Sequence, residues 1–299
     1  MKKTYSKNVM ILFLTALIWG TGFVAQSAGA EHVPPFTFNC IRCILGGGIL
    51  LIYLKGRDIR HKRVKEELPR NKKALLLGGI LCGIILCAGM GLQQIGIAYT
   101  TVGKAGFLSG LYILMVPILG LFLKKHVEMK TWISVLIAAV GLYFLCITES
   151  FSLQKGDAYM LICAVFFAGH ILVIDFFSPK VDGVCMSCIQ FFVCGIISGV
   201  FMLLFETPSI EAIQNGWFSI LYAGAMGCGI AYTLQIVGQK NMNPTVASLI
   251  LSIEMVVSVL AGFLVFGERL TSRELIGCTL MFGAIILAQL PQKRRDYVA

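Results

Sequence analysis

Two ionisable side chains stand inside long apolar stretches of this 299-residue sequence, where they could bind a charged ligand or carry a proton. Arg42 lies in the stretch FTFNCIRCILGGGIL, and Glu254 lies near the middle of the apolar run 246–266. A charge among apolar helices costs several kcal/mol unless it is paired or faces water. Arg42 is therefore predicted either to contact an anion or a gate, or to hold helices together through a salt bridge or backbone carbonyls.

Glu254 has two predicted roles. Removal from water favours the neutral form of a carboxyl, so Glu254 could take up and release a proton inside the membrane. It could equally remain ionised as the partner of a cation such as Arg42, or contact a cationic ligand. The sequence leaves this choice open, and a proton is therefore one expected partner.

Several further polar side chains lie within or at the ends of apolar runs. Trp19 and Gln26 share one helical stripe, which is typical of a cavity wall. His170 is expected either in a site or as a hydrogen-bonded core histidine, and Lys104 either attracts an anion or extends to the membrane interface. The residues predicted to bind or gate a small ligand are Trp19, Gln26, Arg42, Gln93, Lys104, Tyr112, His170, Gln235 and Glu254.

The composition indicates the environment of these residues. Of the chain, 57% is hydrophobic and 13% is charged, and the mean hydropathy is +0.84, whereas a soluble protein carries about 25% charged residues. We therefore expect an all-α integral membrane protein with the lipid bilayer as its partner. The net charge of +10 lies between apolar runs and forms no basic patch interleaved with aromatic residues, so no nucleic-acid partner is predicted.

Ten apolar runs approach the ~20 residues that a bilayer requires. The first is longer than the apolar core of a signal peptide and is kept as a span. Runs one to four and six to nine should line a cavity, whereas runs five and ten have few polar residues and should be peripheral. The runs are 9–26, 36–54, 74–98, 102–123, 132–148, 158–177, 184–205, 217–237, 246–266 and 275–290.

An internal repeat relates the two halves of the chain. Residues 91–145 match residues 233–287 without a gap at a shift of 142, which places Gln93 on Gln235 and Tyr112 on Glu254. Small residues recur on one face of a continuous helix expected over 101–123, which favours close helix packing. A fainter match at a shift of 148 places Arg42 on Gln190.

The repeat unit holds five spans, and an odd number makes the second copy enter the membrane from the opposite side. We therefore predict ten transmembrane helices in two inverted five-helix repeats, residues 1–148 and 149–299. Lysine and arginine gather at the N-terminus, in 55–73, in 124–130 and at 293–295. By the positive-inside rule, both termini of this multi-pass protein should lie on the cytoplasmic side of the inner or plasma membrane.

The sequence contains no Walker loop, HExxH or GxSxG motif, so neither ATP hydrolysis nor a catalytic residue is predicted. The eleven cysteines suggest no disulfide framework, and neither a metal site nor a cofactor is expected. Alternatives from other classes are a membrane-embedded enzyme and a structural scaffold. An enzyme would need catalytic residues clustered at one interface, and a scaffold would not need buried Arg42 and Glu254.

The two halves resemble the two EamA-like domains of the drug/metabolite transporter superfamily over nearly the whole chain. The resemblance implies a secondary transporter, not an enzyme, that exports or exchanges a small metabolite, amino acid or drug by alternating access; a homodimer is left open. This family often has proline after the glutamate of the ninth span, where this chain has Met255, so a helix break there is not implied. The matching residues are Trp19, Gly20, Arg42, 101–107, 244–248, Glu254 and 266–271.

This topology leads to a direct test with reporter fusions. Reporters fused after Lys65 and at Ala299 should both read cytoplasmic, because the positively charged segments stay inside. A reporter inserted within 151–155 should read external, since five spans precede it. A cytoplasmic signal from that last position would contradict the inverted arrangement.

Overall fold

The computed structural model describes residues 2–64, 71–99, 102–124, 127–146, 155–266 and 271–289, apart from some side chains, including those of 60–64 and Lys104. The described residues are helical and contain no strand. Among these residues, seven helices are long and apolar enough to cross a membrane, and three apolar helices are shorter, Leu108–Phe122, Met129–Gly141 and Leu275–Leu287. Together they coincide with the ten predicted apolar runs, and that all ten cross the bilayer stays a prediction.

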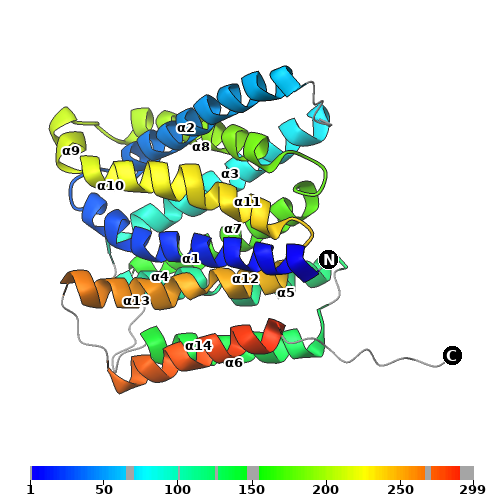
Figure 1. The fold of residues 1–299 in the computed structure, drawn as a ribbon. Helices are drawn as coiled ribbons and strands as arrows, with labels where there is room; N and C mark the ends of the chain where they lie inside the picture. The colour runs from blue at the N-terminus through cyan, green and yellow to red at the C-terminus, as the bar shows by residue number, and fades with distance from the viewer. Residues whose placement is uncertain are drawn as a thin grey trace.

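Figure 1 colours the helices in chain order, from blue at the N-terminus to red at the C-terminus. The first half contains α1 (Lys2–Ala30), α2 (Pro35–Val64), α3 (Lys72–Ile97), α4 (Val102–Gly110), α5 (Tyr112–Phe122) and α6 (Met129–Cys146). The second contains α7 (Lys155–Phe177), α8 (Gly183–Phe205), α9 (Ile210–Asn215), α10 (Trp217–Leu221), the π-helix η1 (Tyr222–Tyr232), α11 (Thr233–Gln239), α12 (Pro244–Leu251), α13 (Ile253–Phe266) and α14 (Ser272–Gln289).

The fourth and ninth apolar runs are each broken near the middle, so the prediction of one continuous helix over 101–123 is wrong. At Leu111 the backbone tightens, and the Leu114 N–H donates to the Leu111 carbonyl at 3.0 Å. At Ser252 it tightens likewise, and the Met255 N–H donates to the Ser252 carbonyl at 3.1 Å. These i→i+3 bonds are 3₁₀ geometry. The break at Ser252 thus forms although Met255, and not proline, follows Glu254.

Helices α2 and α8 pack antiparallel along their length and are joined at both ends. At one end the Glu206 carboxylate accepts from the N–H groups of Phe36 and Thr37 at 2.8 and 2.7 Å, satisfying donors that a helix N-terminus leaves free. At the other end Arg57 Nη1 lies 2.8 Å from Asp182 Oδ2. Although burial alone would raise the pKa of Asp182, the Cys185 N–H and Arg57 hold it below its ordinary value.

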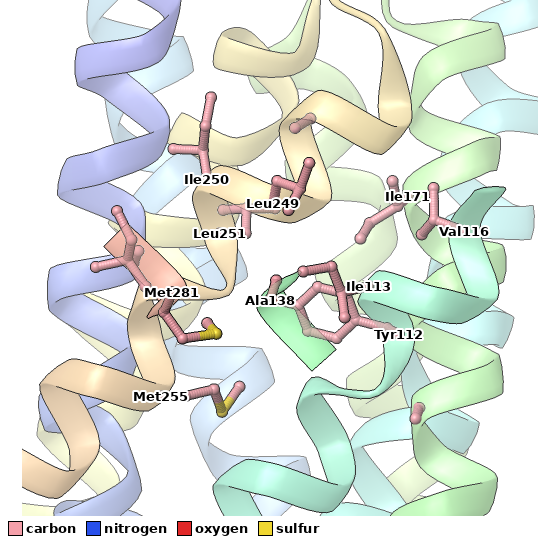
Figure 2. Packing of buried hydrophobic residues seen from close by; sticks show 14 of the residues in the cluster. Tyr112, Ile113, Val116, Ala138, Ile171, Leu249, Ile250, Leu251, Met255 and Met281 are labelled. Atoms are coloured by element: carbon pink, nitrogen blue, oxygen red, sulfur yellow. The ribbon is translucent and has the colours of Figure 1, made fainter. Parts of the chain in front are cut away.

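The remaining helices are arranged around this pair. Helix α1 packs against α13 and against η1 and α11, whereas α7 packs against α4, α5 and α3. Helices α6 and α14 pack on each other along one side of the bundle (Figure 1). The largest apolar core joins this pair to the two broken helices, and Figure 2 shows Ala138 of α6 and Met281 of α14 beside Ile113 and Met255.

A glycine allows α1 to lie directly on α13 beside the second break. A Cβ atom at Gly20 would lie 2.7 Å from the backbone carbonyl oxygen of Glu254 and would also overlap Val257. Any side chain here would push the two helices apart. The close approach brings this part of α1, including the preceding residue Trp19, to the same level of the bundle as Glu254.

Candidate functional site

One cavity opens between the helices of the two halves and has an empty volume of about 660 Å³, part of which is open to solvent. It is lined by residues of α1, α2, α3, α5, α7, η1, α11, α12 and α13. Every residue of the predicted ligand set lines it except Lys104, whose side chain lies outside the described residues. The structure thus brings these residues together, and their role in binding a ligand remains a prediction.

Tyr112 and Glu254 meet at the centre of the site. The Tyr112 hydroxyl donates to Glu254 Oε1 at 3.0 Å, and the two side chains are 3% and 5% exposed. Each residue lies in the first turn after a helix break, Tyr112 in α5 and Glu254 in α13. They are also the residues that the 142-residue shift matches. Equivalent positions of the two sequence halves are therefore in direct contact.

Arg42 is 4% exposed and only partly satisfied. Its Nη1 donates to Gln26 Oε1 at 2.8 Å, and its Cζ lies 5.2 Å from the Phe38 ring centroid. Its Nε and Nη2 atoms have no hydrogen-bond partner in the part of the chain that the structure describes. A buried donor without a partner costs about 1–3 kcal/mol, and more when it is charged. The guanidinium therefore has room for an anion or a water molecule.

The predicted alternative in which Arg42 forms a structural salt bridge is not found. No carboxylate of the described residues forms an ion pair with Arg42 within 4.0 Å, whereas Arg57 at the other end of α2 pairs with Asp182. Glu254 is bonded to Tyr112 instead, so the suggested Arg42–Glu254 pair is wrong for this conformation. The described partner of the guanidinium is the uncharged amide of Gln26 in α1.

His170 lines the cavity and is also hydrogen-bonded, so the choice between its two predicted roles stays open. Its Nε2 lies 3.0 Å from Gln190 Oε1, and this glutamine belongs to α8. No described residue of α8 lines the cavity, which corrects the expectation that the seventh run would form part of the wall. Helix α8 instead supports the wall from behind. None of the described residues of α6 and α14 line it either, as expected for peripheral helices.

Tyr232 is a central wall residue that sequence reasoning missed. Its ring lies 4.5 Å from that of Trp19, 5.9 Å from His170 and 5.7 Å from Phe191, measured between centroids. An aromatic wall of this kind can hold the apolar part of a ligand. Tyrosine in an apolar run is common, so its type alone gave no signal.

The π-helix η1 supplies Tyr232 and other wall residues that the sequence did not predict. It runs for eleven residues, Tyr222–Tyr232, and supplies Tyr222, Gly227 and Cys228 to the cavity. A π-helix is rare and often occurs at functional sites, and its i→i+5 bonds change which residues share a face. The Tyr222 hydroxyl donates to the Ile18 carbonyl of α1 at 3.2 Å. The three glycines within 224–229 were the available sequence signal for irregular geometry.

Comparison with known proteins identifies the class of this protein. The model of the EamA-like transporter family matches residues 6–147 and again 154–290. The chain therefore belongs to the EamA-like transporter family, a family of membrane transporters.

Relatives and solved structures agree with this assignment. An uncharacterized transporter of Archaeoglobus fulgidus is 31% identical over 280 residues, which cover 93% of this chain and 84% of the relative. The uncharacterized inner membrane transporter YedA of Escherichia coli is 24% identical, covering 93% of this chain and 89% of YedA. A crystal structure with 19% identity matches with a TM-score of 0.76 over 95% of this chain and 96% of its own, which shows the fold alone.

The geometry around Arg42 predicts how its variants behave. Arg42→Ala should abolish exchange of labelled compounds in proteoliposomes while folded protein remains in the membrane, because the unpaired guanidinium is lost. Arg42→Lys should recover little, since an ammonium cannot reproduce the planar fork of donors. The exposed Lys73→Ala variant is the control and should exchange normally. Unchanged exchange, or loss of folded Arg42→Ala protein, would contradict a ligand-binding role.

Proposed function

We propose that this chain is an inner-membrane secondary transporter that exports or exchanges a small metabolite, amino acid or drug by alternating access. The observation that carries the proposal is the shared cavity, where unpaired Arg42 and buried Glu254 lie among helices of both halves. A ligand with an anionic group could bind Arg42, and its neutral or cationic part could lie near Glu254 and the aromatic wall.

The two other classes fit these contacts less well. In a membrane-embedded enzyme a cavity histidine would be expected to act on a nucleophile, and His170 is bonded to the Gln190 amide instead. A structural scaffold gives no reason for a buried guanidinium with unsatisfied donors. The family assignment also favours transport.

We further propose that residues 1–148 and 149–299 are inverted repeats of five transmembrane helices each. The packing supports this, because contacts made by helices of one half have counterparts between the equivalent helices of the other half. The contact of α1 with α13 corresponds to that of α7 with α4 and α5, and the contact of α2 with η1 corresponds to that of α8 with α3. Helix α2 also packs on α8, and α6 packs on α14. Inverted repeats allow the halves to exchange conformations and so open a central site to either side.

In this topology, with both termini cytoplasmic, the cavity reaches from the middle of the bundle toward the external end. Arg42 follows the start of α2 by seven positions, which is about 10 Å along a helix. Gln26 and Gln93 likewise lie near the ends of α1 and α3 at that side. The relative YedA is named an inner membrane transporter, which is the location that we propose here.

Transport energy must come from a gradient or from exchange, since the sequence holds no nucleotide-binding motif. We propose that Glu254 carries a proton. Its partner Tyr112 is neutral, so the hydrogen bond can persist whether the carboxyl is charged or neutral. Glu254 would take up a proton from one side of the membrane and release it on the other, which would couple proton movement to movement of the substrate.

Counterflow in proteoliposomes tests both parts of this proposal. The pool of amino acids and metabolites is unlabelled inside the proteoliposomes and labelled outside. The wild-type protein should exchange at least one compound faster than empty liposomes. Glu254→Gln keeps the shape and removes titration, so it should keep exchange and lose accumulation driven by a pH gradient. The exposed Glu211→Gln variant should keep both activities.

The remaining outcomes would contradict the proposal. Unchanged pH-driven accumulation by Glu254→Gln would rule out the proton role. Loss of both activities would assign Glu254 a fixed ionic role instead. Absence of exchange of any compound in the pool by wild-type protein would contradict transport of these classes of substrate.

A further inference from the structure

A cluster of free thiols lies behind the cavity, where α2, α3, α8 and η1 meet. Cys43 Sγ of α2 lies 3.5 Å from Cys194 Sγ of α8, and both side chains are fully buried. Cys87 Sγ of α3 lies 3.5 Å from Ser198 Oγ, and Cys228 of η1 belongs to the same packed cluster. The proposed transport cycle uses none of these thiols.

The Cys43 and Cys194 sulfur atoms are in van der Waals contact at 3.5 Å. A disulfide has an S–S length of about 2.05 Å, so the Cys43 and Cys194 sulfurs need to approach by about 1.5 Å. The helices already lie close at this level, because a Cβ atom at Gly195 would be 3.4 Å from Cys43 Cβ. Small side-chain rotations and a slight helix shift can therefore supply the approach.

A small oxidant has a route to the cluster through the cavity. Cys228 forms part of the cavity wall, and Cys43 belongs to the same packed cluster as Cys228. Hydrogen peroxide is a neutral molecule not much larger than water, so it can enter a space that holds water. The cluster that holds Cys43 and Cys194 therefore reaches the cavity wall at Cys228.

We infer that Cys43 and Cys194 are a peroxide-sensitive modification site, whose disulfide joins α2 to α8. One thiolate attacks a peroxide oxygen, the O–O bond breaks, and a sulfenic acid and hydroxide form. The second thiol then attacks the sulfenic sulfur and releases water. In total two thiols and one hydrogen peroxide give one disulfide and two waters, and the sulfur pair loses two electrons to the peroxide.

The bond would cross the boundary between the two halves, and this consequence rests on the proposed function. Helix α2 belongs to the first half and α8 to the second, and they pack along their whole length. If the halves rock against each other, α2 and α8 must tilt or slide at this contact. A covalent link near the middle should therefore stop exchange, and reduction should restore it.

The chemical part of the inference is tested without any transport assay. Purified full-length protein is treated with hydrogen peroxide, its remaining thiols are alkylated after denaturation, and its peptides are analysed by mass spectrometry. The expected product is a linked Cys43–Cys194 peptide that is two hydrogens lighter and is reversed by dithiothreitol. Cys82→Ala, which removes a buried thiol of a different cluster, should leave the product unchanged. Free Cys43 and Cys194 after treatment, or a link to another cysteine, would overturn the assignment.

The functional part is tested by counterflow of the same labelled pool. Peroxide should abolish exchange by wild-type protein, dithiothreitol should restore it, and Cys194→Ala should exchange normally and resist peroxide. If the disulfide forms and exchange continues, the locking role is wrong. Because peptide analysis of the wild-type protein needs neither activity nor a variant, a failure of the proposed transport function remains distinguishable from a failure of the disulfide.

Discussion

The hydrogen bond between Tyr112 and Glu254 is the interaction on which the centre of this structure depends. Helix breaks at Leu111 and Ser252 place these two polar side chains in the interior of an apolar bundle. Both side chains are almost fully buried, so each polar group needs a partner within the protein. Each side chain provides that partner for the other, and the bond joins the broken helix of one half to the broken helix of the other.

The surrounding helices are positioned relative to this centre. The absence of a side chain at Gly20 lets α1 lie against the Glu254 backbone, which brings Trp19 and Gln26 into the cavity wall. Gln26 then holds Arg42 of α2, and α8 holds His170 through Gln190. The anchored ends of α2 and α8 fix this second layer. The cavity is consequently a polar site within an apolar bundle, with one cation that the described residues leave without an ionic partner.

Much of this arrangement could be predicted from the sequence because the bilayer imposes simple rules. Apolar length located the helices, and the high cost of burying polar groups identified Arg42, His170 and Glu254 as wall candidates. The 142-residue shift already matched Tyr112 with Glu254, although it did not reveal their contact. That contact arises because both residues lie where the two equivalent breaks meet.

Other features could not be predicted because they depend on backbone geometry that composition does not encode. A helical wheel at 100° per residue assumes a continuous helix, so the prediction over 101–123 did not anticipate the break at Leu111. Tyr232 ends a π-helix whose geometry the sequence does not show, and its place in the wall was not predicted. The salt-bridge hypothesis for Arg42 is wrong for this conformation, in which the guanidinium is hydrogen-bonded to an uncharged amide, Gln26. The charge of Arg42 alone does not predict which uncharged side chain will lie beside its guanidinium in the fold.

A double-mutant cycle on Tyr112 and Glu254 tests the central claim most directly. Equilibrium unfolding in mixed detergent micelles would be measured for wild-type protein, Tyr112→Phe, Glu254→Leu and the double variant. If the hydrogen bond joins the two broken helices, the two substitutions should show a coupling free energy of about 1–3 kcal/mol, so that Tyr112→Phe destabilises the wild-type protein far more than the Glu254→Leu variant. Additive effects, within about 0.5 kcal/mol, would contradict the claim that this bond holds the centre of the structure together.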